Sequence, residues 1–162
     1  MATPDFILAL REKIGTAPLW LTGVTAVVLR GDDEVLMVQR ADSGQWTPVT
    51  GIIDPGEEPA DAAVREVLEE SGIVAVAERL VKAHVLPPQQ YDNGDQVQYL
   101  DLVFRLRWVS GDPHPADGEN TQARWFRLDE LPELRPTMID RIAAARSDDE
   151  RARFTEGGVV RP

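Results

Sequence analysis

The chain of 162 residues contains no cysteine, so disulfides, thiolate zinc sites and a cysteine nucleophile are all excluded. It also lacks an apolar run long enough to span a bilayer, and residues 1–13 lack the apolar core of a signal peptide. We therefore expect no membrane partner, and the cytoplasm is the expected compartment. Hydrophobic residues make up 43% and charged residues 28%, as in folded proteins. Length and composition predict a single domain over residues 1–162.

Basic residues are scarce, with 17 Lys and Arg against 28 Asp and Glu and a formal net charge of −11. Such a chain repels a polyphosphate backbone, so a broad nucleic-acid surface is not expected. A small anionic substrate stays compatible with this charge, because a divalent metal can mask local carboxylates and a few arginines can line a pocket. The ordinary interpretation, that acidity keeps the protein soluble, carries most of the weight.

The spacing of apolar residues predicts a mixed α/β order of helices and strands. Alternation over residues 100–108 predicts a strand with one core face and one polar face that includes Asp101. A turn signal at residues 92–95 would pair this strand with its predecessor. The charged tail over residues 147–162 is expected to be poorly ordered. The expected elements are a leading helix within 1–15, strands over 24–30, 35–40 and 45–53, a helix over 59–71, strands over 73–86, 100–108 and 122–128, and helices near 129–134 and over 137–146.

Three glutamates stand in an unfavourable place in the helix predicted over residues 59–71. Glu66, Glu69 and Glu70 have the spacing i, i+3 and i+4, so they share one stripe of that helix. The helix dipole disfavours an anion in the last turn by roughly 0.3–1 kcal/mol each for Glu69 and Glu70. Glu66 and Glu70 also repel each other by roughly 0.2–0.5 kcal/mol. A functional site and an ordinary solvated acidic face both account for such a departure from local preference.

The residues before the helix favour the functional interpretation. A tight turn at Pro55-Gly56 is followed by Glu57, whose carboxylate could reach the helix and orient Arg65. Arg65 can in turn offset some of the repulsion through Glu69. Clustered carboxylates are hard oxygen ligands that suit Mg²⁺, which fills its other positions with water and phosphate oxygens. Such ions can bridge adjacent phosphates, activate a water and neutralise a leaving phosphate.

The segment GIIDPGEEPADAAVREVLEESGI resembles the Nudix box, whose pattern is G-x5-E-x7-R-E-U-x-E-E-x-G-U with U an aliphatic residue. Gly51 is followed after five residues by Glu57, and after seven more by the run that begins at Arg65 and ends at Ile73. All the fixed positions are filled over these 23 residues, so the signal is highly specific. The resemblance implies a Nudix-type α/β/α sandwich around a mixed β-sheet, with a loop–helix–loop catalytic element.

The same resemblance implies metal-dependent hydrolysis of a nucleoside diphosphate linked to another moiety, with Mg²⁺ as the cofactor and Mn²⁺ as a substitute. One of the stripe glutamates would be the general base, and the Glu57–Arg65 pair is structural in such proteins. A homodimer is also common among them. The catalytic set implied is Glu66, Glu69, Arg65 and Glu57, and the metal set is Glu66, Glu69, Glu70, the Gly51 carbonyl and Glu119. Glu119 is included because a later loop usually supplies one more acid, and a solvated loop glutamate is an equally good interpretation.

Recognition of the substrate is less specified by the sequence. Arg40 resembles a basic position that often faces substrate, although a salt bridge at the strand end is the favoured interpretation. Tyr99, Arg105 and Arg107 could stack on a base or hold phosphate, and edge solvation explains them equally well. Many similar proteins carry a second glycine where this chain has Thr50, and a side chain there would restrict approach of the backbone to phosphates.

Three functions are compatible with these residues. The first is an enzyme acting on a small nucleotide, either ADP-ribose-like or a (d)NTP. The second is a catalytically idle nucleotide-binding module that senses such a ligand. The complete carboxylate stripe favours the enzyme, because a binding module has no need of it. The third, an RNA-end decapping hydrolase, keeps the chemistry but requires a basic channel, and the net charge of −11 opposes it.

Overall fold

The computed structural model describes residues 3–161. An eight-stranded mixed sheet forms the centre of the chain, and a separate two-stranded hairpin follows it. The elements are α1 (Asp5–Ile14), β1 (Leu19–Arg30), β2 (Glu34–Arg40), β3 (Trp46–Thr47), β4 (Val49–Ile52), α2 (Pro59–Ser71), β5 (Val74–Val85), β6 (Gln89–Gln90), β7 (Gln96–Ser110), β8 (Asn120–Arg127), α3 (Pro136–Arg146), β9 (Phe154–Glu156) and β10 (Val159–Arg161).

The main path of the sheet runs β3-β2-β1-β7-β5, with β4 added to β1, β6 to β7 and β8 to β2. The long central strands β1 and β7 pair in parallel over 11 register positions, whereas β5 and β2 run antiparallel to their neighbours. β1 and β2 form an antiparallel hairpin, and the predicted pairing of β5 with β7 is confirmed. Parallel pairing at the centre makes this a mixed sheet that needs cover on both faces.

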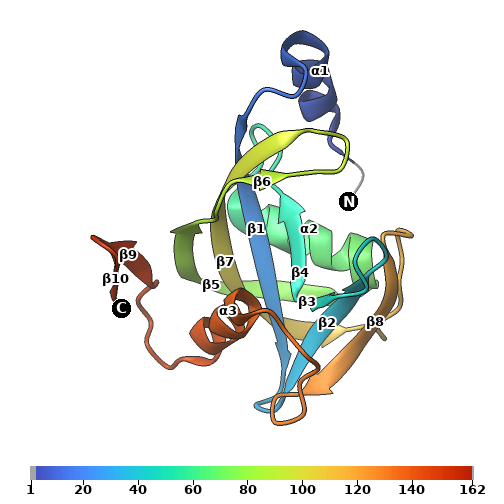
Figure 1. Cartoon of the computed structure of the whole chain (residues 1–162). Helices are drawn as coiled ribbons and strands as arrows, with labels where there is room; N and C mark the ends of the chain where they lie inside the picture. Colours follow the sequence, from blue (N-terminus) through green and yellow to red (C-terminus); the bar gives the residue numbers. More distant parts are fainter. Residues whose placement is uncertain (1–2, 162) are drawn as a thin grey trace.

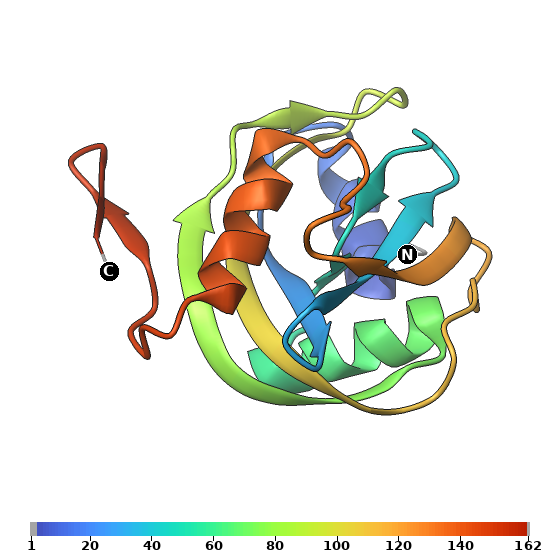
Figure 2. The same cartoon turned by 90° about the horizontal axis from the view of Figure 1, so that it is seen from below.

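The two faces of the sheet carry separate cores under separate helices (Figure 1, Figure 2). Ala62, Ala63 and Val67 of α2 pack with Val24 and Ala26 of β1 on one face. On the other face Ile142, Ala144 and Ala145 of α3 pack with Val27 and Leu29, the β1 residues that point the opposite way. The molecule is thus an α/β/α sandwich, as the sequence predicts.

The helix expected near residues 129–134 is absent, because this segment is a turn followed by irregular chain. Pro132 lies in its middle and cannot donate the backbone hydrogen bond that an interior helical position requires. The helix that follows begins at Pro136, where a missing N–H costs nothing because the first turn has no acceptor for it. Leu131 and Leu134 still pack against the core under α3, so the segment is held by side chains and not by helical bonds.

Helix α1 and the C-terminal tail contact different strands of the main sheet. Helix α1 anchors its buried Ile7 against Leu21 and Val97, at the starts of β1 and β7. The tail, for which the sequence predicts little order, forms the exposed hairpin of β9 and β10 (Figure 2). Arg153 joins this tail to the edge strand β5 through backbone bonds with Val81 and Ala83. Within residues 3–161 no helix is long and apolar enough to cross a membrane.

Candidate active site

Helix α2 carries the glutamate stripe, and its limits follow from its end residues. Pro59 occupies the first turn, and Gly72 ends the helix in the left-handed conformation with φ of 68°. The apolar stripe that packs on the sheet is flanked by the acids, so two of them are carried inward. Glu66 is 3% exposed and Glu70 is 2% exposed, whereas the side chain of Glu69 is 54% exposed. The expected stripe is therefore largely buried, which excludes an ordinary solvated acidic face.

Gly51 gives the Glu66 carboxylate its space beside strand β4. A Cβ atom at position 51 would stand 2.2 Å from Cδ of Glu66, closer than any real contact, so any other residue would displace the carboxylate from this position. The neighbouring Thr50 pairs with Thr25 of β1, and adjacent strand residues point to opposite faces. The side chain of Thr50 therefore lies on the face away from Glu66. The glycine that matters for the carboxylate is Gly51.

Arg65 connects the loop before the helix with the stripe. Its Nε and Nη2 atoms donate to the two oxygens of Glu57 at 2.7 and 2.9 Å, and Nη2 also donates to the Ile52 carbonyl at 3.2 Å. Nη1 donates to Glu66 Oε1 at 2.9 Å and to Glu69 Oε2 at 3.1 Å. The hydrogen bonds from Arg65 hold the pKa of Glu57 below its ordinary value. The guanidinium thus fixes the loop and two acids at once.

The stripe opens onto a cavity of about 580 Å³ whose walls come from distant parts of the chain. Glu66, Glu69 and Arg65 form the α2 wall. Other lining residues come from the segment that precedes β8, and Pro4 before α1 also belongs to the lining. The complete lining is Pro4, Ile52, Asp54, Arg65, Glu66, Glu69, Ala116, Asp117 and Glu119. Glu119, which the sequence suggests as a further metal ligand, therefore reaches the same cavity as the stripe.

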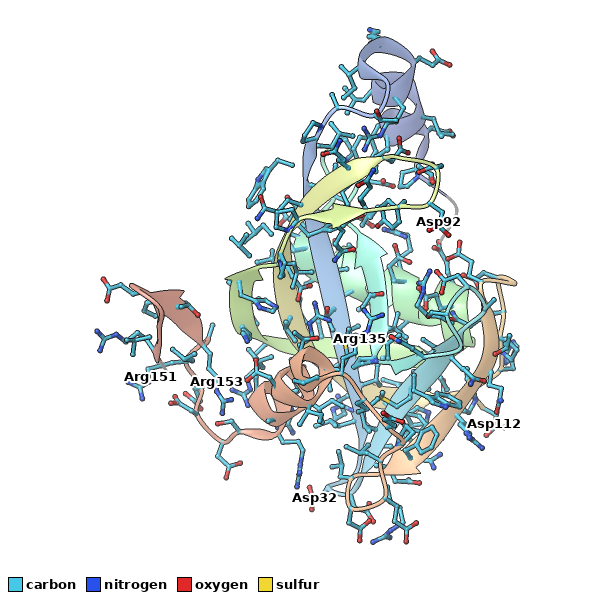
Figure 3. The ribbon with its side chains drawn as sticks, viewed as in Figure 1. Asp32, Asp92, Asp112, Arg135, Arg151 and Arg153 are labelled. Carbon is cyan, nitrogen blue, oxygen red and sulfur yellow. The ribbon has the colours of Figure 1, made fainter. Side chains whose placement is uncertain are left out.

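The segment that carries Glu119 is hydrogen-bonded to the C-terminal end of α2. His114 N donates to the Ser71 carbonyl at 3.0 Å, and Ala116 N donates to the Glu70 carbonyl at 3.3 Å, so both carbonyls at the helix end have partners. The His114 ring lies so close to Gly72 that a Cβ atom there would be 2.2 Å from its Cε1. The sequence offers no metal-ligand spacing for His114, and its contacts here are structural. From Asp112 the segment runs along the side of the molecule opposite to Arg151 and Arg153 (Figure 3).

Glu70 is the most buried acid of the stripe and has an incomplete set of partners. Asn120 Nδ2 donates to Glu70 Oε2 at 2.9 Å, while Glu70 Oε1 and Asn120 Oδ1 are buried without a hydrogen-bond partner. Burial raises the pKa of Glu70 to about 7 against the opposing effect of Asn120. Burial also raises the pKa of Glu66, although Arg65 opposes the change. Both shifts mark sites where negative charge is under-compensated.

The residues of this site fit a divalent cation by their chemistry. Carboxylate and backbone carbonyl oxygens are the hard ligands that Mg²⁺ takes in proteins. A buried carboxylate oxygen without a donor, such as Oε1 of Glu70, is costly unless a cation or proton compensates it. Among residues 3–161 no three acids or histidines are placed to hold one metal ion, and Arg65 bonds to both Glu66 and Glu69. Ion binding would therefore require these carboxylates to rotate away from Arg65.

The three residues suggested for substrate contact are dispersed. Arg40 forms a salt bridge with Asp42, with its closest contact at 2.8 Å. This is the salt bridge at the strand end that the sequence favours. Tyr99 is half-buried beneath α1 and its hydroxyl lies 3.2 Å from that of Tyr91. Arg105 pairs with Glu78 on the α3 face, whereas α2 covers the other face. The structure thus separates Arg105 from the glutamate stripe. Arg107 pairs with the same Glu78.

Sequence reasoning missed Asn120 and the contacts of Asp101. Asn120 bonds to Glu70 across 50 residues, a separation at which no spacing rule applies. Asp101 was expected on a polar strand face but is 3% exposed, because α3 covers that face and supplies Arg141. His84, which lacks ligand spacing in the sequence, also contacts Asp101 at 2.8 Å. A polar residue on an alternating strand gives no signal that a helix from elsewhere will cover it.

Comparison with known proteins finds similarity to Nudix proteins in both sequence and fold. The NUDIX domain profile matches residues 20–145, which include the whole sheet apart from the first residue of β1. A MutT-like protein of Streptomyces ambofaciens is 33% identical over 122 residues, which are 75% of this chain and 73% of that protein. A NUDIX hydrolase structure from Nitrosomonas europaea superposes with a TM-score of 0.65 at 27% identity, covering 83% of this chain and 93% of the other.

A further relative is the NAD-capped RNA hydrolase NudC of Escherichia coli, which is 35% identical over 134 residues. The match covers 76% of this chain but only 49% of that protein, so the chain spans about half the length of this relative. Members of the matching family are pyrophosphohydrolases and generally use a divalent metal. The NUDIX profile matches most of the chain, and the chain covers 73% of the MutT-like protein of Streptomyces ambofaciens. This chain therefore belongs to the Nudix hydrolase family.

Proposed function

We propose that this chain is a magnesium-dependent hydrolase that cleaves the pyrophosphate bond of a nucleoside diphosphate linked to another moiety, either ADP-ribose-like or a (d)NTP. The observation that carries the proposal is the common cavity of Glu66, Glu69 and Glu119. These acids come from a helix and from a distant loop, so their meeting depends on the fold. A cavity lined by hard oxygen ligands supports binding of a metal–phosphate substrate.

The proposed metal ligands are the stripe glutamates Glu66, Glu69 and Glu70, together with the Gly51 carbonyl and Glu119. Mg²⁺, or Mn²⁺ in its place, would supply activation of water and neutralisation of the charge on the phosphates. Glu66 and Glu69 are the candidates for general base, because both line the cavity, whereas the buried Glu70 is not part of the lining. A base must come within hydrogen-bond reach of the attacking water, and only a carboxylate at the cavity surface can do so.

Arg65 and Glu57 have a supporting role in this proposal. The bidentate pair holds the loop from Ile52 to Glu58 against α2, and this loop carries the chain from Gly51 into the helix. Arg65 also neutralises two of the acids while no cation is bound. When a cation binds, the guanidinium can release Glu66 and Glu69 and still stay fixed by Glu57. The pair is therefore proposed to position the site and not to react.

The proposed class of substrate rests on a relative's substrate and on the net charge of this chain. The relative that acts on NAD-capped RNA directs attention to dinucleotides, because NAD itself joins two nucleosides through a pyrophosphate. The net charge of −11 opposes a long RNA chain but not a small dinucleotide screened by a metal. Arg40 and Tyr99 are proposed to contact the nucleoside end, and the charge of Arg40 acts on Glu70 of the stripe. Arg105 on the α3 face has no such support.

The experiment is a substrate panel with the full chain: ADP-ribose, NAD, UDP-sugars, (d)NTPs and an NAD-capped RNA, with products separated by chromatography. Turnover of at least one small nucleotide with Mg²⁺, lost in EDTA and restored by Mg²⁺, is expected. Turnover that persists in excess EDTA after metal stripping contradicts the metal mechanism. Binding of nucleotides without turnover identifies an idle sensor module, and cleavage of capped RNA alone identifies a decapping hydrolase.

A further inference from the structure

Asn120 occupies a fixed position next to the proposed metal ligands. It is the first residue of β8 and pairs with Arg40 of β2, where the register of the two strands shifts between Gln39 and Arg40. The preceding Glu119 carbonyl accepts from Ala41 N at 2.9 Å. The backbone around Asn120 is thus held by β2 and by the residue that follows it, and the Asn120 side chain, 4% exposed, is enclosed.

The side chain of Asn120 acts on one oxygen of Glu70 only. Its Nδ2 donates to Oε2 at 2.9 Å, and Oε1 of the same carboxylate is buried without a hydrogen-bond partner. Arg40 of β2, whose charge acts on Glu70, is committed to Asp42 and makes no hydrogen bond to Glu70 that would replace this one. The amide therefore occupies Oε2 and leaves Oε1 as the oxygen available to a cation.

A carboxylate that is held at one oxygen has less freedom to rotate and offers a metal a single ligand atom. Groups that hydrogen-bond to ligands in this way commonly fix their orientation and raise metal affinity about 10–100-fold. An amide suits the position because it donates a hydrogen bond without bringing a charge that would compete with the cation. Arg65 is the charged counterpart at Glu66, and the Glu66 carboxylate must turn away from it to reach a cation, whereas Asn120 can stay bonded to Glu70.

We propose that Asn120 is a positioning residue for the metal site: it holds Glu70 by Oε2 and presents Oε1 to the ion. This inference rests on the proposed function, in which Glu70 is a metal ligand. It requires the N–H donor of Asn120 and not its carbonyl oxygen. Replacement by alanine and replacement by the isosteric aspartate, which lacks the N–H, should therefore have the same direction of effect.

The test measures Mn²⁺ affinity from the free-ion EPR signal and Mg²⁺ affinity by competition, at pH 8, in the parent, Asn120→Ala, Asn120→Asp and Glu70→Gln chains. Both Asn120 variants should bind Mn²⁺ about 10-fold or more weakly. The Mg²⁺ concentration for half-maximal turnover should rise by the same factor, with a smaller change of kcat at saturating Mg²⁺. Thermal unfolding in EDTA verifies folding, and if Asn120→Ala does not fold, the isosteric Asn120→Asp carries the test.

The matched control is Asn93→Ala. Asn93 also donates from Nδ2 to a carboxylate, Asp95 at 3.0 Å, but it is exposed in the β6–β7 turn. Its replacement should leave Mn²⁺ affinity unchanged. Parent-like affinity in both Asn120 variants, or tighter binding by Asn120→Asp, overturns the proposal, since the second result would make the Asn120 oxygen a direct ligand. If Glu70→Gln binds Mn²⁺ as the parent does, the metal site of the proposed function fails as well. If Glu70→Gln binds Mn²⁺ weakly while both Asn120 variants bind it as the parent does, only the role of Asn120 is contradicted.

Discussion

Two buried carboxylates lie on opposite faces of the sheet and differ in their partners. Glu70 of α2 is 2% exposed and Asp101 beneath α3 is 3% exposed, so water solvates neither. Asp101 accepts hydrogen bonds from three side chains, at 2.9, 2.8 and 3.0 Å, namely Thr25, His84 and Arg141. Glu70 accepts a hydrogen bond at Oε2 from one neutral amide and has no partner at Oε1.

Equal burial therefore gives opposite effects on acidity. Burial raises the pKa of Asp101, but the hydrogen bond from His84 and the charge of Arg141 outweigh it, and the pKa lies below its ordinary value. For Glu70 burial dominates, and the pKa rises to about 7. The protein completes the environment of one acid and leaves that of the other short of positive charge. The first arrangement fastens α3 to the sheet, and the second suits a cation.

The largest expected effect that tests this contrast is on turnover in Glu70→Gln. Loss of an anionic ligand should lower kcat/KM by about 100-fold or more with the best substrate, because the metal then stabilises less of the charge on the phosphates. Steady-state kinetics over a range of Mg²⁺ concentrations measure it. Full turnover in this variant would remove Glu70 from the mechanism. Asp101→Asn, assayed at a temperature where it is folded, should keep most of its activity.

The free energy of unfolding should fall in Asp101→Asn, the variant that is expected to keep most of its activity. Asp101→Asn leaves the buried guanidinium of Arg141 without its counter-charge, and breaking such a buried pair costs about 3–5 kcal/mol of unfolding free energy. Urea denaturation in EDTA measures this loss. Asp129→Asn, which removes an exposed acid from Arg127, is the control and should unfold like the parent. A loss in the control as large as in Asp101→Asn would contradict a special role for the buried network.

The sequence was sufficient for the α2 side of this contrast and insufficient for the α3 side. The limits of α2, Pro59 and Ser71, were predicted because proline and glycine act locally at helix ends. Asp101 bonds to Thr25 across 76 positions and to Arg141 across 40, so no local pattern encodes the cluster. Asn120 is likewise invisible, since its value depends on where β8 begins against β2. Motifs within one loop–helix unit are predictable, and partners brought by the sheet are not.

A smaller effect is expected for the pair that fixes the loop before α2. In a double-mutant cycle, Glu57→Ala and Arg65→Ala should show a coupling of about 0.5–3 kcal/mol in unfolding free energy, as contacting residues do. The bidentate geometry, with distances of 2.7 and 2.9 Å, supports this. The exposed pair Arg127 and Asp129 gives a reference cycle, in which the coupling should be smaller. Additive effects of the Glu57 and Arg65 replacements would contradict the pairing.

The smallest expected effect sharpens the contrast most. Without metal, Glu70→Gln should be as stable as the parent or more stable by about 0.3–1 kcal/mol, because it removes an anion from the last turn of α2. The stabilisation that Mg²⁺ gives to the parent should shrink in this variant, since only the folded state offers the assembled site. Urea denaturation with EDTA and with Mg²⁺ measures both quantities. A metal-free loss of several kcal/mol would make Glu70 a structural acid like Asp101, and the two faces of the sheet would then not differ in kind.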